Sequence, residues 1–143
     1  MAHVTNIHIA ESPWPGQVHS VDEVEAVANR GLVGDRKYGA KRQISIVSND
    51  ELAEAAAKLG SEIPAGAHRR QITISEGRFD RTAGGMIRIG EVVISVNGDC
   101  SPCDEMEQSI GPGARAALVE LGGVTGTIVE GGTIRVGDPV ELA

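Results

Sequence analysis

The chain has 143 residues, enough for one compact domain that buries roughly 68–70% of its unfolded surface without disulfide support. Twenty Asp and Glu residues against thirteen Lys and Arg residues give a formal net charge of −7, which argues against a nucleic-acid partner held through many phosphates. No stretch approaches the ~20 apolar residues of a membrane helix, and the N-terminus lacks the basic and apolar blocks of a signal peptide. We therefore expect a single domain over residues 1–143 that is cytoplasmic, has reduced thiols and has no membrane or nucleic-acid partner.

The first half of the chain alternates predicted strands with predicted helices. Three segments carry apolar side chains at every second position: residues 5–9, 44–46 and 72–74. This period is typical of strands with one buried face. Ser20 and Ser48 each precede a glutamate by three residues, a capping-box pattern that predicts the start of a helix. Gly31 and Gly60 are predicted to end these two helices.

The second half is richer in predicted strands. Apolar residues again alternate over residues 87–89, 92–96, 134–136 and 140–142, and a further strand is predicted around Ile128. Turn signals separate these strands at Gly90-Glu91, Gly131-Gly132 and Gly137-Asp138-Pro139. A third helix is predicted from Pro112 to Leu121. Seven or eight short strands predict a mainly β protein with a few short helices, folded as a closed or nearly closed antiparallel β-barrel.

Both cysteines lie in one tetrad, Cys100-Ser101-Pro102-Cys103, where a predicted strand ends and a short helix begins. Three interpretations follow from the residues alone. The pair is half of a zinc site, although the four histidines that could complete it show no paired spacing. It is a dithiol redox motif, although such motifs usually lie early in a βαβ unit. Or Cys103 is a small buried hydrophobe, which its polar neighbours disfavour.

Acidic residues flank this tetrad, and arginines elsewhere offer compensation. Asp99, Asp104 and Glu105 disfavour a thiolate at Cys103 unless a cation or metal offsets them. Two basic clusters occur upstream, at residues 36–42 and 68–70. Guanidinium groups match phosphate oxygens bidentately, so these clusters predict an anion site, whereas the alternative is that they are ordinary surface. No P-loop or dinucleotide-binding glycine motif is present.

Five segments, in chain order, resemble a MOSC domain, the domain at the C-terminus of molybdenum cofactor sulfurases and in small stand-alone bacterial proteins. They are Gly31-Leu32-Val33-Gly34-Asp35-Arg36, Arg42-Gln43-Ile44-Ser45-Ile46, Gly85-Met86-Ile87-Arg88-Ile89-Gly90, Cys100-Ser101-Pro102-Cys103 and Gly131-Gly132-Thr133-Ile134-Arg135-Val136-Gly137-Asp138. Each segment is weakly specific alone, but their common order makes the resemblance fairly specific. It extends over residues 4–140 and implies a β-rich, barrel-like fold that binds molybdenum cofactor, a pterin dithiolene with a phosphate tail.

The resemblance also implies site residues. Cys103, which matches the family's cysteine after proline, is the implied functional sulfur. It would carry a persulfide delivered by a separate pyridoxal-phosphate cysteine desulfurase, or ligate molybdenum in an enzyme that reduces N-hydroxylated compounds with an electron-transfer protein. The resemblance implies that Gly34, Asp35, Arg36 and Arg42 bind the cofactor, and the second basic cluster adds Arg69, Arg70 and Gln71 to the predicted cofactor-binding residues. Arg42 is the leading candidate to hold the phosphate.

The sequence departs from the family pattern at two positions. Arg70-Gln71-Ile72 stands where the family commonly has Glu-Asn-Ile, and Lys37 stands where His often follows Gly-Asp-Arg. These differences weaken any expectation of an activity that depends on that acid or that histidine. The short chain leaves little room for a substrate lid. A non-enzymatic cofactor carrier or partner-binding module is therefore the alternative function.

Overall fold

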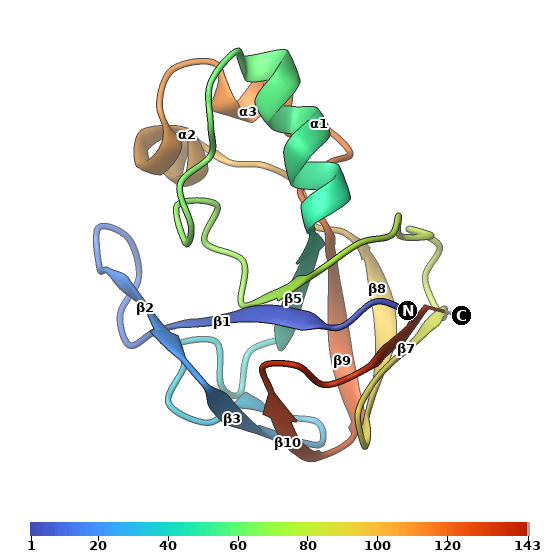
Figure 1. The fold of residues 1–143 in the computed structure, drawn as a ribbon. Coiled ribbons are helices and arrows are strands. Elements are labelled where there is room, and N and C mark those ends of the chain that lie inside the picture. The colour runs from blue at the N-terminus through green and yellow to red at the C-terminus, as the bar shows by residue number, and fades with distance from the viewer. Residues whose placement is uncertain (143) are drawn as a thin grey trace.

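The computed structural model describes residues 1–142, and over these residues the protein is mainly β with three short helices. In chain order the elements are β1 (Val4–Ala10), β2 (Val18–Val21), β3 (Glu23–Val27), β4 (Gly31–Leu32), β5 (Ile44–Ser48), α1 (Asn49–Leu59), β6 (Ile72–Ile74), β7 (Met86–Ile89), β8 (Val92–Asp99), α2 (Asp104–Ile110), α3 (Ala114–Ala117), β9 (Val124–Glu130), β10 (Gly132–Arg135) and β11 (Val140–Leu142). The helices gather at one end of the molecule, and β3 and β10 lie at the opposite end (Figure 1). None of the helices in this part of the chain is long and apolar enough to span a membrane.

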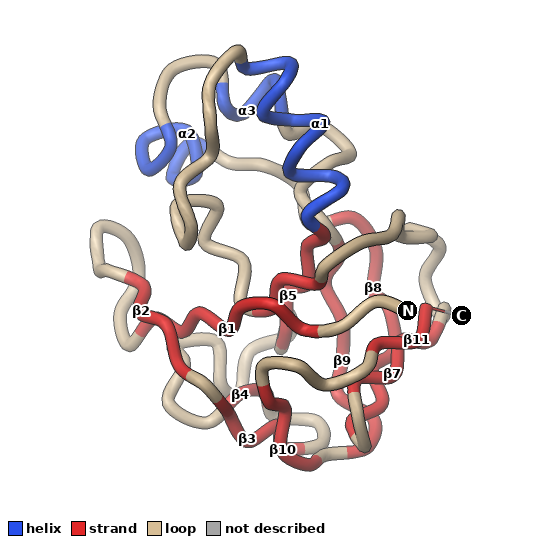
Figure 2. The backbone as a smooth tube through the Cα atoms, in the orientation of Figure 1, coloured by secondary structure: helices blue, strands red, loops and turns tan. Residues whose placement is uncertain are grey.

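Two sheets form the β part. The larger has eight strands in the order β11-β7-β8-β9-β5-β6-β1-β2, and the smaller has the order β10-β3-β4. All pairings are antiparallel except that of β5 with β6, which α1 connects as a parallel crossover. Figure 2 shows how long loops carry the chain between the strands and the helical end.

The predicted closed or nearly closed barrel is not confirmed, because the sheets of the described residues do not close into a barrel. The larger sheet is open, with β11 and β2 as its edges. An isolated bridge between His3 and Pro139, and a hydrogen bond from the Val140 amide to the Ala2 carbonyl at 2.9 Å, connect the start of β11 to the residues that lead into β1. Strand β2 tolerates its edge position because His19 and Ser20 are polar and exposed.

The helix predictions had mixed outcomes. Ser48 caps α1 as predicted, with its hydroxyl accepting a hydrogen bond from the Glu51 amide, and Gly60 ends the helix in the left-handed conformation at φ 78°. The helix predicted after Ser20 is wrong, because that segment forms β2 and β3. The helix predicted over 112–121 is reduced to the single turn of α3.

The hydrophobic residues form two clusters. The larger lies within the sheets and contains the apolar faces of the strands. The smaller joins the helices through Ala55 of α1, Met106 of α2, and Ala114, Leu118 and Leu121 around α3. The segment from Asp99 to Cys103 links the end of β8 to the start of α2, and therefore crosses from the sheet to the helical end.

Candidate functional site

A pocket of about 190 Å³ opens where the sheet meets the helical end. It is lined from β1, β5, β9 and α2 and from the loops between them. Seven of the eight residues predicted for the site line it: Asp35, Arg36, Arg42, Arg69, Arg70, Gln71 and Cys103. The structure therefore brings together residues that are up to 68 positions apart in the sequence, from position 35 to position 103.

Gly34 is the predicted residue that does not line the pocket. It is exposed and has a φ of 89°, a conformation that glycine adopts without strain. The turn closes when the Asp35 amide donates to the Leu32 carbonyl at 3.2 Å. Gly34 thus shapes the turn that carries Asp35 into the pocket wall.

Asp35 and Gln71 form a buried polar link across the pocket floor. The Asp35 carboxylate accepts hydrogen bonds from the amides of Ala10 and Lys37, each at 2.9 Å, and from Gln71 Nε2 at 2.7 Å. Gln71 Oε1 in turn accepts from the Ser45 amide at 2.7 Å. Because these contacts occupy both side chains, we assign a structural role to Asp35 and Gln71: they hold β1, β5 and the loop around Asp35 in place.

Positive charge in the pocket lining comes from Lys37 and four arginines, Arg36, Arg42, Arg69 and Arg70, whereas Asp35 and Glu105 are the acids of the lining. The ion pairs within residues 1–142 involve other arginines, and none involves these four. In a chain with a net charge of −7, such a concentration of arginines without acidic partners favours binding of an anion.

Arg69 is the arginine whose environment most clearly calls for a ligand. Its Nη1 donates to the Gly16 carbonyl at 2.7 Å, and its guanidinium lies 5.3 Å from the centre of the Trp14 ring. Its Nε and Nη2 are buried and have no hydrogen-bond partner in the described part of the chain. Burial, followed by the charge of Arg36, lowers the pKa of Arg69. Buried donors without partners are costly, and an anion in the pocket would satisfy them.

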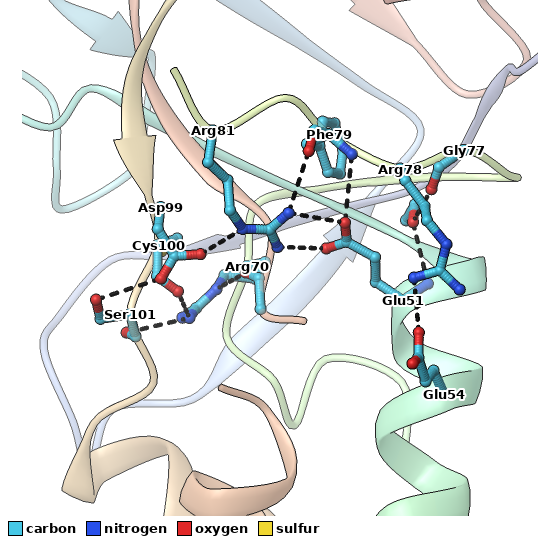
Figure 3. Close-up of polar contacts among 12 residues, drawn as sticks. Glu51, Glu54, Arg70, Gly77, Arg78, Phe79, Arg81, Asp99, Cys100 and Ser101 are labelled. Atoms are coloured by element: carbon cyan, nitrogen blue, oxygen red, sulfur yellow. Dashed lines mark hydrogen bonds and ion pairs between the residues drawn. The ribbon is translucent and has the colours of Figure 1, made fainter. Parts of the chain in front are cut away.

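Arg70 has a different environment, although it is adjacent in sequence. Its Nε donates to the Gly122 carbonyl at 2.7 Å, and its Nη2 donates to the Cys100 carbonyl at 2.8 Å and to the Ser101 carbonyl at 3.4 Å (Figure 3). The residue is only 6% exposed. Its donors are therefore directed at backbone carbonyls, two of which lie in the segment that precedes Cys103.

The two cysteines differ in exposure. Cys103 is exposed and lies at the N-terminal boundary of α2, and Cys100 is half-buried. Burial raises the pKa of Cys100, and the nearby charges of Arg70 and Arg42 oppose that shift. No cluster of three His, Cys, Asp or Glu side chains suited to hold a metal ion is found in residues 1–142.

The acids around the tetrad are largely paired. Asp99 accepts from Arg81 at 2.6 Å, and Asp104 accepts from Arg115 at 2.6 Å. Glu105 lines the pocket. The sequence predicted that cations would offset these acids, but it did not identify Arg81 and Arg115, which form the ion pairs with Asp99 and Asp104.

Two histidines add a neutral region near the arginines. His8 lines the pocket and is 4% exposed, and its ring packs edge-on against His68 with 5.8 Å between ring centres. Burial lowers the pKa of His8. Burial, with the neighbouring His8 and Arg70, lowers the pKa of His68 to about 3. Both rings are therefore neutral at pH 7.

Sequence reasoning did not assign several lining residues to the site, including His8, Ser45 and Thr125. The period of two in β1 places His8 on the face opposite Ile7 and Ile9, but it does not reveal what that face meets. Ser45 and Thr125 are paired residues of neighbouring strands β5 and β9. Ser45 and Thr125 line the same pocket as the arginines because β5 and β9 are neighbours in the sheet, and the sequence alone does not give that strand order.

The fold and site define a β-rich domain with an arginine-lined pocket and a thiol at its edge. The chain belongs to the MOSC domain family, whose model matches residues 33–141. A comparison with curated proteins finds no match.

Solved structures share this fold. YuaD from Bacillus subtilis is 20% identical with a TM-score of 0.83, and the match covers 98% of this chain and 94% of that one. YiiM from Geobacillus stearothermophilus is 14% identical with a TM-score of 0.73, covering 100% and 75% of the two chains. YiiM from Escherichia coli is 18% identical with a TM-score of 0.71, covering 100% and 70%. At these identities the likeness establishes the fold.

Proposed function

We propose that the protein binds molybdenum cofactor in the arginine-lined pocket and that Cys103 supplies the thiolate that meets it. Membership of the MOSC family supports this choice of ligand. The observation that carries it is the pair of buried Arg69 donors, Nε and Nη2, which lack partners in the described residues and line the same pocket as Cys103.

The residues present fit such a ligand. Arg69, Arg36 and Arg42 would hold the phosphate, because guanidinium groups offer several donors to its oxygens. Arg69 replaces Arg42 as our leading phosphate residue, because Arg42 is exposed whereas Arg69 has buried donors without partners. Asp35 and Gln71 keep the pocket open by bonding to one another and to the backbone. When bound, the cofactor would supply a metal that cycles between oxidation states.

Two roles for Cys103 follow. As a ligand it would bind molybdenum through its soft sulfur, in an enzyme that reduces N-hydroxylated compounds. That reaction consumes two electrons and two protons and releases water, so it requires a separate electron donor. As a sulfur carrier it would hold a persulfide from a pyridoxal-phosphate desulfurase, a role favoured by the exposure of Cys103 to a partner protein. A carrier that catalyses no reaction would use the same pocket.

The first test is the molybdenum content of protein purified from a host that makes the cofactor. We expect near-stoichiometric molybdenum in the wild type and a loss of about tenfold in Arg69→Met, because a charge-assisted contact of this kind contributes about that factor. Arg115→Met is the matched control, since Arg115 pairs with the exposed Asp104 and does not line the pocket. Wild-type protein without molybdenum, or equal contents in both variants, would contradict the proposal.

The role of Cys103 is then separated with Cys103→Ser. Loss of N-hydroxylated base reduction by cofactor-loaded protein indicates the ligand role. A persulfide mass on wild-type Cys103 after incubation with a desulfurase indicates the carrier role.

A further inference from the structure

The structure holds its two cysteines in different environments although only two residues separate them. Cys103 is exposed at the boundary of α2, whereas Cys100 is half-buried at the end of β8. The Cys100 amide donates to the Gly123 carbonyl at 2.9 Å, so the backbone at Cys100 is fixed to the turn before β9.

Arg70 holds the same segment from the pocket side. Its guanidinium bonds to the Gly122 carbonyl. It also bonds to the carbonyls of Cys100 and Ser101 (Figure 3). One buried side chain thus ties the peptide groups on both sides of Ser101 to the turn at Gly122. A flexible segment would not keep three carbonyls within reach of one planar group.

Arg81 holds the segment from the other side. Its Nε donates to Asp99 at 2.6 Å, immediately before Cys100, and its Nη2 donates to Glu51 at 2.9 Å. Glu51 is 1% exposed and belongs to the first turn of α1. The chain entering the tetrad is therefore fixed to the helical end through a largely buried ion-pair network.

We propose that Arg70 and Arg81 are positioning residues that keep Cys100 protected and present Cys103 as the thiol available for chemistry. Arg70 holds the carbonyls of Cys100 and Ser101, and Arg81 holds the Asp99 carboxylate. Within residues 1–142 neither arginine forms a hydrogen bond or an ion pair with Cys103. This selection applies to any reaction of Cys103 and does not depend on the ligand of the pocket.

Thiol alkylation by iodoacetamide measures this selection directly, because sulfur displaces iodide only when the thiolate is accessible. In the wild type we expect Cys103 to be alkylated about tenfold or more faster than Cys100. Cys100→Ser and Cys103→Ser proteins assign each rate to one thiol. Peptide masses then give both rates in the intact sequence.

Arg70→Met and Arg70→Lys test the positioning role. We expect the rate at Cys100 to rise about tenfold or more in both variants while the rate at Cys103 changes little. Neither Met nor Lys has the planar guanidinium that bonds to the Cys100, Ser101 and Gly122 carbonyls together, so the segment should open more readily. Loss of the positive charge alone would act in the opposite direction, since Arg70 favours the Cys100 thiolate. A faster rate in Arg70→Met therefore reports opening.

Arg78→Met is the matched control, because Arg78 forms an exposed ion pair with Glu54 and does not touch the tetrad. It should leave both rates at wild-type values. Low urea concentrations separate local from global opening, since only global unfolding depends steeply on urea. The proposal is overturned if wild-type Cys100 reacts as fast as Cys103, or if Cys100 in both Arg70 variants reacts only at the rate that global unfolding permits.

Discussion

At the scale of single residues, burial determines the charge around the pocket. His68 is 3% exposed, and its Nδ1 accepts a hydrogen bond from the Arg70 amide at 2.9 Å. That bond places the proton of the neutral ring on Nε2. His68 therefore supports the backbone of Arg70 without adding positive charge beside the arginines.

The lowered pKa of His68 predicts a pH dependence of stability. Folding lowers this pKa from 6.5 to about 3, so between these values the unfolded chain binds the proton more readily. The contribution of neutral His68 to the free energy of unfolding is complete above pH 6.5 and is lost as the pH falls toward 3. We expect His68→Asn, which keeps an acceptor for the Arg70 amide, to remove about 1 kcal/mol per pH unit from the slope of unfolding free energy between pH 6 and 5. Urea titrations measure both slopes, and equal slopes would contradict this.

The sequence predicted most residues of the pocket, but it did not predict which arginines have donors free for a ligand and which bond to the backbone. The Arg69-Arg70 pair reads as two equivalent anion-binding groups, yet the structure leaves two donors of Arg69 without partners and directs those of Arg70 to carbonyls. Arg69 has a φ of 59°, which turns the two side chains apart. The side chains then bond to partners that are distant in the sequence, Gly16 for Arg69 and Gly122 for Arg70.

At the scale of elements, local sequence patterns predicted a helix correctly only where the tertiary contacts also favoured a helix. Ser48 and Ser20 have the same spacing to a glutamate, but only Ser48 starts a helix. After Ser20, Val24 and Ala26 are buried and Glu25 is exposed, because this segment pairs with β10, more than 100 residues further along the chain. A pairing of that range cannot be predicted from a capping pattern.

The turn between α3 and β9 provides a prediction at this scale. Gly123 has a φ of 83°, and a Cβ there would collide with the Ile46 carbonyl of β5. We expect Gly123→Ala to lower the unfolding free energy by about 3 kcal/mol or more, because backbone strain and overpacking add. Gly137→Ala is the control: its φ is 96° with open space around the site, so strain alone should cost about 1–2 kcal/mol. Equal losses in urea denaturation would contradict the role of Ile46.

At the scale of the whole molecule, the sheet and the helical end have separate hydrophobic clusters. The Arg81 network joins them, since Glu51 lies on α1 and Asp99 ends β8 (Figure 3). Arg70 adds a second link between the pocket wall and the turn at Gly122. The segment that carries the thiols crosses this junction, so its geometry depends on how the two parts are held together.

The network predicts strong coupling between Glu51 and Arg81. Arg81→Met should lower the unfolding free energy by about 3–5 kcal/mol, because it leaves the Glu51 carboxylate buried without its cation. The Glu51→Gln/Arg81→Met protein should recover part of that loss, since it contains no unpaired buried charge. Arg78→Met removes an exposed pair on the same loop and should leave the unfolding free energy close to the wild-type value. A double-mutant cycle in urea measures the coupling, and additive losses from the two substitutions would mean that the ion pair does not join the two parts of the molecule.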